Sequence, residues 1–159
     1  MLKKVFLITA FSLVAIFIQI LLGPWMTIRE IRPDFLLILV MFIGLNQGKV
    51  SGQLYGFGIG LVADAIGLGS FIGLSALAKT IAGFGAGMLY RRRSRLNPVL
   101  FHGFEILIIV IHYAIIYTIN FKGVDISAQV MGLRYILPSV IYTALFYFVM
   151  QYFIPSLSE

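Results

Sequence analysis

Long apolar runs separated by short polar segments dominate the chain and predict a bundle of membrane helices. The runs cover residues 5–23, 32–48, 50–67, 71–90, 98–120 and 130–153. Most of them approach the roughly 20 residues that a helix needs to cross the hydrocarbon core of a bilayer. We therefore predict an all-α membrane protein, a six-transmembrane-helix bundle in which residues 1–159 form a single integral membrane domain.

The second run is short, and its residues 34–48 extend only about 22 Å as a helix, so it could cross the bilayer or dip into it and return. A basic cluster directly follows the fourth run: Arg91, Arg92, Arg93 and Arg95. If the second run crosses, this cluster lies on the same side as Lys3, Lys4 and Lys49. The positive-inside rule favours that arrangement, with both termini cytoplasmic. The four arginines are then expected to contact anionic lipid headgroups at the inner face.

Composition supports a membrane location and limits the chemistry. Hydrophobic residues make up 60% of the chain and charged residues only 11%, which leaves too little polar surface for a soluble domain. The net charge of +6 would suggest nucleic-acid binding in a soluble protein, but basic residues beside membrane helices explain it here, so no nucleic-acid partner is expected. The absence of cysteine excludes disulfides, thiolate metal sites and cysteine nucleophiles.

A glycine-rich hairpin of the third and fourth runs, residues 52–90, is the element around which we expect the chain to be organised. Glycines recur at every fourth position within each run: Gly52, Gly56 and Gly60 in the third run, and Gly83 and Gly87 in the fourth. Small residues at this spacing let helices approach closely in lipid, where hydrophobic association between helices gives no advantage. We predict helix packing within the chain rather than a seam between two copies.

Two opposite charges, Asp64 and Lys79, lie within the apolar runs of this hairpin. An ion at mid-bilayer costs about 2.5–3.5 kcal/mol on insertion scales, so such groups normally face protein, water or a partner. The two backbones differ in depth by roughly 7 Å, a distance that a lysine stem largely covers. We expect a structural or partner-binding role for both residues and test the hypothesis that they pair with each other.

Two enzymatic interpretations of this segment fail on their chemistry. Residues 73–80, GLSALAKT, imitate a phosphate-binding loop, but alanine replaces the glycine that lets the backbone approach phosphate. Ser75 and Lys79 share a helix face and could form a hydrolytic dyad, but a carboxylate as close as Asp64 would favour a charged lysine, which cannot act as a base. No catalytic or nucleotide-binding residue is therefore predicted.

Three ionisable residues of the fifth run also fall on one helix face: His102, Glu105 and His112. They could bind a metal or relay protons, although no HExxH arrangement is present. Hydrogen bonds between helices are the commoner role for such groups and are favoured here. We predict no metal site and no cofactor.

Two sequence features resemble the MreD family of bacterial rod-shape-determining membrane proteins. The first is the triplet Arg32, Pro33 and Asp34 before the short second run. The second is the segment GFGIGLVADAIGLGSFIGLSAL, residues 56–77, with its acid near the end of the third run. The resemblance implies a non-enzymatic component of the wall-elongation machinery in the bacterial cytoplasmic membrane. The predicted topology places the triplet in an outer loop.

The resemblance also implies partners and a fold. Such proteins associate with a single-span, coiled-coil MreC-like protein and, through it, with the actin-like MreB and the wall-synthesising glycosyltransferase and transpeptidase. Their bundle is expected to be similar to the substrate-binding subunits, or S components, of energy-coupling-factor transporters. A membrane scaffold is thus the leading hypothesis. The alternative is a substrate-binding membrane subunit of a vitamin or small-molecule transporter. Depletion of the protein separates the two hypotheses: a scaffold predicts loss of rod shape, and a transporter subunit predicts loss of nutrient uptake.

Overall fold

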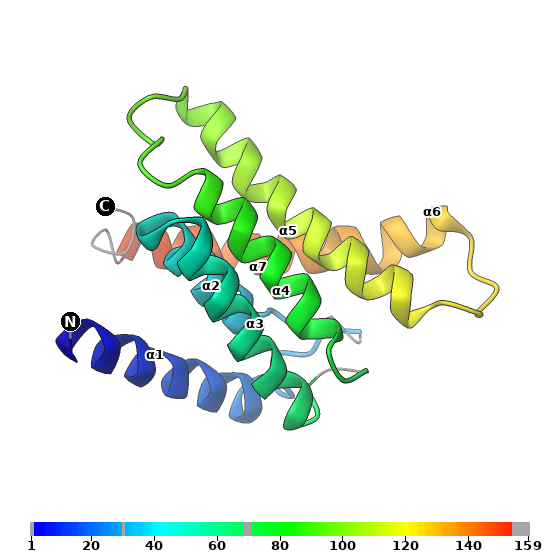
Figure 1. Ribbon diagram of the computed structural model, residues 1–159. Helices are drawn as coiled ribbons and strands as arrows, with labels where there is room; N and C mark the ends of the chain where they lie inside the picture. Colours follow the sequence, from blue (N-terminus) through cyan, green and yellow to red (C-terminus); the bar gives the residue numbers. More distant parts are fainter. Residues whose placement is uncertain (1, 30, 69–70, 154–159) are drawn as a thin grey trace.

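The computed structural model describes residues 2–29, 31–68 and 71–153, with side chains from residue 9 onward. Within these ranges the chain is helical apart from turns and one isolated bridge between Ile28 and Ile31 (Figure 1). The elements are α1 (Leu2–Leu21), α2 (Phe35–Gln47), α3 (Lys49–Ala65), α4 (Leu74–Met88), α5 (Pro98–Asn120), α6 (Ala128–Val130), the π-helix η1 (Met131–Ile136) and α7 (Leu137–Phe153). Because α6, η1 and α7 are continuous, the helices form six rods, and the predicted all-α fold is confirmed.

Successive rods run in opposite directions, so the bundle has two distinct ends. At one end α1, α3 and α5 finish and α2, α4 and α6 begin; we call it the Asp34 end after the residue that caps α2. The other end holds the loop of residues 89–97 between α4 and α5, and we call it the arginine end. Helix α1 also begins there and α7 also finishes there (Figure 1). This alternation is compatible with the predicted topology.

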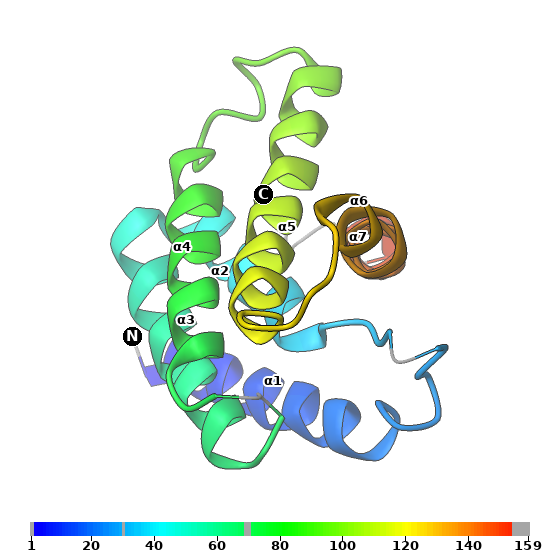
Figure 2. The ribbon, with the colours of Figure 1, turned by 90° about the vertical axis from the view of Figure 1, so that its right-hand side faces the viewer.

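Helix α2, and not the predicted hairpin, occupies the centre of the bundle. It contacts α1, α3, α4 and α7, and Figure 2 shows it enclosed by the other rods. Seven of its large apolar side chains are at most 7% exposed: Leu36, Leu37, Ile38, Val40, Met41, Phe42 and Ile43. A helix that is apolar on every side can face either protein or lipid on each side, so the composition of α2 permits this central position.

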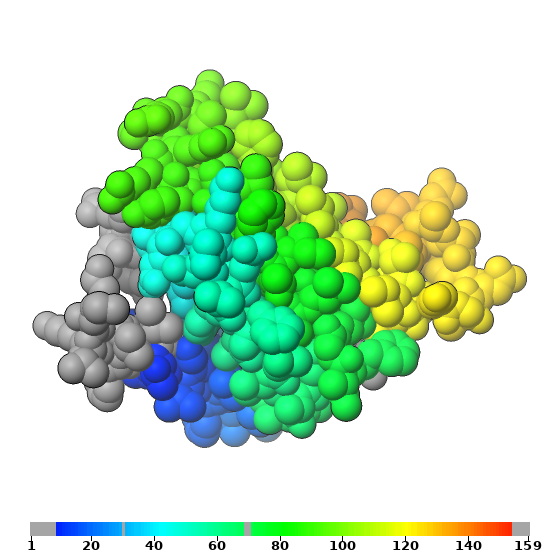
Figure 3. Space-filling view, viewed as in Figure 1, coloured from blue at the N-terminus to red at the C-terminus, as the bar shows by residue number. Residues whose placement is uncertain are grey.

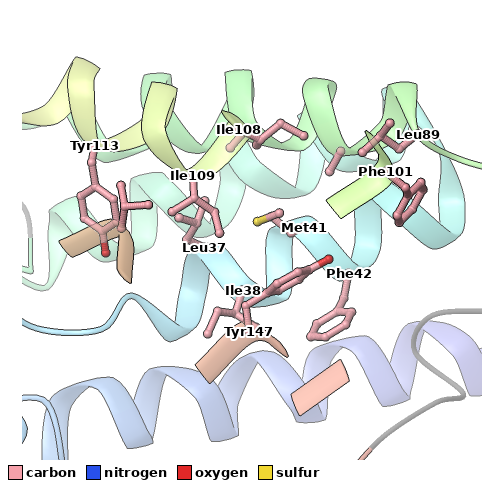
Figure 4. Packing of buried hydrophobic residues seen from close by; sticks show 13 residues of the cluster. Leu37, Ile38, Met41, Phe42, Leu89, Phe101, Ile108, Ile109, Tyr113 and Tyr147 are labelled. Atoms are coloured by element: carbon pink, nitrogen blue, oxygen red, sulfur yellow. The ribbon is translucent and has the colours of Figure 1, made fainter. Parts of the chain in front are cut away.

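The main core cluster joins α2 to α5 and α7. The rings of Phe42 and Tyr147 lie with their centroids 5.3 Å apart, and Met41 and Ile109 are completely buried beside them (Figure 4). Close packing of this kind penalises any change in side-chain volume. The cluster therefore fixes how α5 and α7 sit against α2.

Helices α3 and α4 touch along the glycines that the sequence spacing singled out. A Cβ atom added to Gly52 would lie under 3.0 Å from the backbone of Gly83, and one added to Gly56 would collide in the same way with Lys79. Gly60 meets Ala76, and Gly87 meets Lys49. The structure thus places these glycines in contacts within the chain. In the space-filling view α3 and α4 form a continuous surface (Figure 3).

The helices differ in their capacity to cross a bilayer. Among the described residues, two segments are long and apolar enough for this by length and composition, Pro98–Asn120 and Ala128–Phe153. Helix α2 has 13 residues. Its axis is about 20 Å long, less than the roughly 30 Å of a hydrocarbon core. Crossing by the other rods stays a prediction, and the predicted turn at residues 69–70 and tail at 154–159 lie outside the described residues.

Candidate functional site: a buried ion pair beneath a polar cavity

Asp34 begins the central helix and holds three other segments to it. Its backbone is extended, and its Oδ1 accepts a hydrogen bond of 2.8 Å from the Leu37 amide, which caps α2. Its own amide donates to Oγ1 of Thr143 on α7 at 3.3 Å. The Thr143 hydroxyl lies 2.5 Å from the Tyr113 hydroxyl on α5. Asp34 therefore fixes the position of α2 relative to α7 directly and, through Thr143, relative to α5.

The second carboxylate oxygen of Asp34 forms an ion pair in the protein interior. The Lys79 ammonium nitrogen lies 2.6 Å from Oδ2, and the two side chains are only 3% and 17% exposed. Nε2 of the fully buried His112 lies 3.4 Å from the same oxygen. Two charges removed from water in this way are tolerated only when each retains its partner. The pair thus ties α2 to α4 beneath the Asp34 end.

The hypothesis that Asp64 pairs with Lys79 is wrong. Asp64 is buried, and its carboxylate accepts from three backbone amides at the start of α4: Gly73 at 2.8 Å, and Ser75 and Ala76 at 3.3 Å. The first turn of a helix has amides without intrahelical partners, and the end of α3 brings Asp64 beside them. Lys79 lies more than a turn deeper, where Asp34 is the available carboxylate. Asp64 is consequently the cap of α4.

The three residues of the triplet lie in the loop between α1 and α2 and differ in burial, and the outward position of this loop stays a prediction. Arg32 is exposed, and its Nη2 donates to the Leu68 carbonyl at 2.6 Å. Pro33 is buried, and Asp34 belongs to the interior network. Gln19 on α1 bonds to the backbone on either side of Asp34: its amide nitrogen donates to the Pro33 carbonyl at 3.2 Å, and its oxygen accepts from the Phe35 amide at 2.9 Å.

Sequence reasoning missed Gln19, although a signal was present. It is the single carboxamide within the first apolar run, and it is 4% exposed. A buried amide needs several hydrogen-bond partners, so its position suggested a contact with backbone. Thr143, in contrast, gave no signal, because a threonine in an apolar helix usually bonds to its own backbone.

A polar cavity of about 300 Å³ lies directly above the ion pair at the Asp34 end. Its polar lining includes side chains from the α1–α2 loop, α4 and α5: Arg32, Asp34, Ser75, Lys79, Tyr113 and Asn120. Oδ1 of Asn120 is buried and has no hydrogen-bond partner among the described residues. Such a lining can hold a polar molecule. Asp34 and Lys79 are among the lining residues. A molecule bound in the cavity would therefore lie against the ion pair that joins α2 to α4.

Comparison with known proteins identifies the family. The family model described as rod shape-determining protein MreD matches residues 1–158. The chain belongs to the MreD family. No curated protein matches it, and no solved structure matches it. The expected similarity of this MreD chain to the S components therefore stays a prediction, whereas its character as a membrane protein with a role in rod shape follows from the family and its apolar helices.

A third interior carboxylate of this MreD chain lies toward the arginine end. Glu105 is 0% exposed and accepts from the Tyr147 hydroxyl at 2.5 Å and from the Gln151 amide at 3.4 Å. Nδ1 of His102 lies 2.7 Å from its other oxygen. The predicted helix face is thus divided, because His102 contacts Glu105 whereas His112 approaches Asp34. Hydrogen bonding between helices accounts for Glu105.

The arginine cluster lies where the MreD chain turns from α4 into α5. All four of its members are exposed: Arg91, Arg92, Arg93 and Arg95. The Arg91 guanidinium lies 5.1 Å from the centre of the Tyr90 ring. Exposed guanidinium groups beside membrane helices are suited to phosphate headgroups. Contact of these residues with anionic lipid remains a prediction.

Proposed function

We propose that this chain is a non-enzymatic scaffold of the bacterial cell-wall elongation machinery, with its six rods crossing the cytoplasmic membrane. The match of the MreD family model to residues 1–158 carries the proposal. In it the scaffold binds an MreC-like single-span protein. That partner in turn links it to the wall-elongation glycosyltransferase and transpeptidase and, indirectly, to MreB.

The interior polar groups support a structural role. Asp34 and Lys79 bond to each other, Asp64 bonds to the start of α4, and Glu105 bonds to α7. Each buried charge therefore has a partner within the chain and is not presented to another protein. A scaffold of this kind would recognise partners through its surface and would use its buried charges to keep that surface in one arrangement.

The loops at the Asp34 end are the surface that we assign to the MreC-like partner. Each presents a large exposed apolar side chain: Trp25 is 87% exposed, Ile28 62%, Ile72 90% and Val124 55%. Tryptophan at such a position commonly lies at the membrane interface, and it is also among the residues that contribute most to protein interfaces. These side chains would form an apolar rim where a second membrane protein can dock.

Depletion of the chain in a rod-shaped bacterium tests the scaffold function. We expect cells to become round and a wild-type copy to restore the rod. A copy carrying Trp25→Ala and Ile72→Ala should reach normal membrane levels but recover less of a tagged MreC-like partner in co-purification. Val99→Ala is the matched control, because Val99 is 79% exposed at the arginine end. Rod shape that persists after complete depletion contradicts the scaffold function.

The cavity favours one second candidate, a substrate-binding subunit of a vitamin or small-molecule transporter. A polar cavity of about 300 Å³ is at the lower end of the size range of ligand pockets. Such a subunit would need an energising partner. In the same depletion strain, normal cell shape with lost uptake of one nutrient would support this candidate over the scaffold.

A further inference from the structure

The C-terminal rod changes its hydrogen-bonding pattern before it becomes α7. Residues 131–136 form the π-helix η1, and the Leu137 amide donates to the Gly132 carbonyl, five residues earlier instead of the four of an α-helix. π-Helical turns are rare and occur frequently at functional sites. None of the residues of η1 is buried, so core packing does not account for the wide turn.

Pro138 explains why the α-helical pattern breaks at this point. Proline has no N–H, so the Arg134 carbonyl lacks the donor that an α-helix would supply, and the proline ring would clash with that carbonyl. A wide turn before the proline moves the two groups apart. The next carbonyl, that of Tyr135, accepts from the Ser139 hydroxyl at 2.7 Å, a contact that often bends helices. The regular α-helix is thus interrupted where η1 meets α7.

The segment on the far side of this interruption is lightly held. It comprises α6 and the loop before it, and it projects past the ends of α3 and α4 (Figure 1). Outside its own rod, η1 packs mainly on α5. The ring of Tyr135 makes this contact, with its centroid 4.8 Å from that of Phe121 and 5.7 Å from that of Tyr117. All three rings are only half-buried, so this small cluster is what holds the segment to α5.

We propose that η1 is a hinge on which α6 and the loop that carries Val124 change position relative to the other rods. Hinge motions are absorbed by a few residues at the ends of elements, and the interruption at Pro138 lies at such an end. Val124 belongs to the apolar rim assigned to the MreC-like partner, so the hinge lets this part of the rim adapt to the partner. The role in docking rests on the proposed function, whereas the hinge itself does not.

Distances between spin labels in the full chain, measured by electron paramagnetic resonance in nanodiscs, test the hinge. The chain has no cysteine, so labels attach only where one is introduced. The test pair joins Leu77→Cys on α4 to Val130→Cys on α6, and the matched control pair joins Leu77→Cys to Leu145→Cys on α7, since all three side chains are exposed. We expect the distance distribution of the test pair to be about twice as wide as that of the control pair, or wider, because hinge motion adds to label motion. Equal widths overturn the hinge.

Variants with opposite effects locate the hinge. Pro138→Ala restores the missing amide, so the distribution of the test pair should narrow to the width of the control pair. Tyr135→Ala removes the ring that holds the segment to α5 and should widen it further. If Pro138→Ala fails to fold, Gly132→Ala supplies the narrowing test, because alanine favours regular helix and its Cβ atom would meet none of the described residues within 4 Å. An unchanged width in a folded Pro138→Ala variant contradicts the assignment of the hinge to η1.

The MreC-like partner tests the role of the hinge in docking. Added to the labelled chain, it should narrow the distribution of the test pair and leave that of the control pair unchanged. A partner that co-purifies with the labelled chain but leaves the test pair as wide as before contradicts the docking role. Rod shape that persists after depletion contradicts the scaffold function and leaves the hinge in place.

Discussion

The Lys79 ammonium nitrogen lies 2.6 Å from Oδ2 of Asp34, a residue 45 positions earlier in the chain. The contact joins the cap of the central helix to the second rod of the glycine hairpin, and both side chains are largely shielded from water. An ion pair so placed fixes the depth of α2 relative to α4. Asp34 is the last residue of the family triplet, and the backbone of Lys79 lies against Gly56 of α3. The ion pair therefore joins the triplet to the contact between α3 and α4.

Loss of either partner of this ion pair should destabilise the protein strongly. We expect Asp34→Asn and Lys79→Met each to lower the free energy of unfolding by about 3–5 kcal/mol, because each leaves a buried group without its partner charge. The asparagine introduced by Asp34→Asn can still cap α2, so the effect should report the charge. The double variant should be more stable than the sum of the single effects predicts, by about 0.5–3 kcal/mol, as measured by denaturant unfolding in detergent.

Lys79→Met combined with Asp64→Asn is the matched control for that cycle. Asp64 bonds to backbone amides and not to Lys79, so these two effects should be additive within about 0.5 kcal/mol. Strong coupling between Asp64 and Lys79 would contradict the assignment of Lys79 to Asp34.

Removal of the Asp64 carboxylate should loosen the start of α4. Asp64→Ala leaves the amides of Gly73, Ser75 and Ala76 without their acceptor, and we expect a loss of about 2 kcal/mol, at the upper end of the range for helix caps. Hydrogen exchange of these three amides should accelerate more than exchange at the centre of α4. Asp125→Ala is the control, since Asp125 is exposed in the loop between α5 and α6. Unchanged exchange in α4 would exclude the capping role.

Alanine at the glycine contacts should separate α3 from α4. A Cβ atom at Gly52 or Gly83 would lie under 3.0 Å from the facing backbone, which cannot rotate away. We expect each substitution to cost about 1–3 kcal/mol, the usual cost of overpacking, measured as a lower midpoint of thermal unfolding. Gly58→Ala, on the same helix but with nothing within 4 Å, should be neutral or stabilising by up to about 1 kcal/mol. Equal effects at Gly52 and Gly58 would show that helix propensity, not contact, is being measured.

Glu105 should contribute to the packing of α7 against α5. Glu105→Ala leaves the Tyr147 hydroxyl and the Gln151 amide without their acceptor, and we expect a loss of about 1–3 kcal/mol for the buried groups left unpaired. Glu105→Gln retains an acceptor of the same length and should lose less. Thermal unfolding of the purified protein compares the two variants. Equal losses would indicate that the charge of Glu105, and not its hydrogen bonds, stabilises this end.

The sequence by itself determined the helices and one of their contacts. Apolar runs bounded by glycine, proline and charged residues specify where helices form. In a membrane, the backbone N–H and C=O groups of a single segment all find hydrogen-bond partners within that segment only when it is helical. Gly52, Gly56 and Gly60 are four residues apart and so lie on one face of a helix. Another helix can approach this face closely, because glycine has no side chain to keep the two backbones apart. The family triplet and the segment around Asp64 carried the correct family resemblance.

Only the tertiary structure decided which helix is central and which charges pair. A uniformly apolar run such as α2 has no periodicity that could show its neighbours, so its burial follows from the packing of all the rods. Two carboxylates, Asp34 and Asp64, lie at the same end of the bundle, and local spacing alone made Asp64 the obvious partner of Lys79. The choice depended on the free amides at the start of α4, which hold Asp64, and on how deep α2 lies, which places Asp34 beside Lys79.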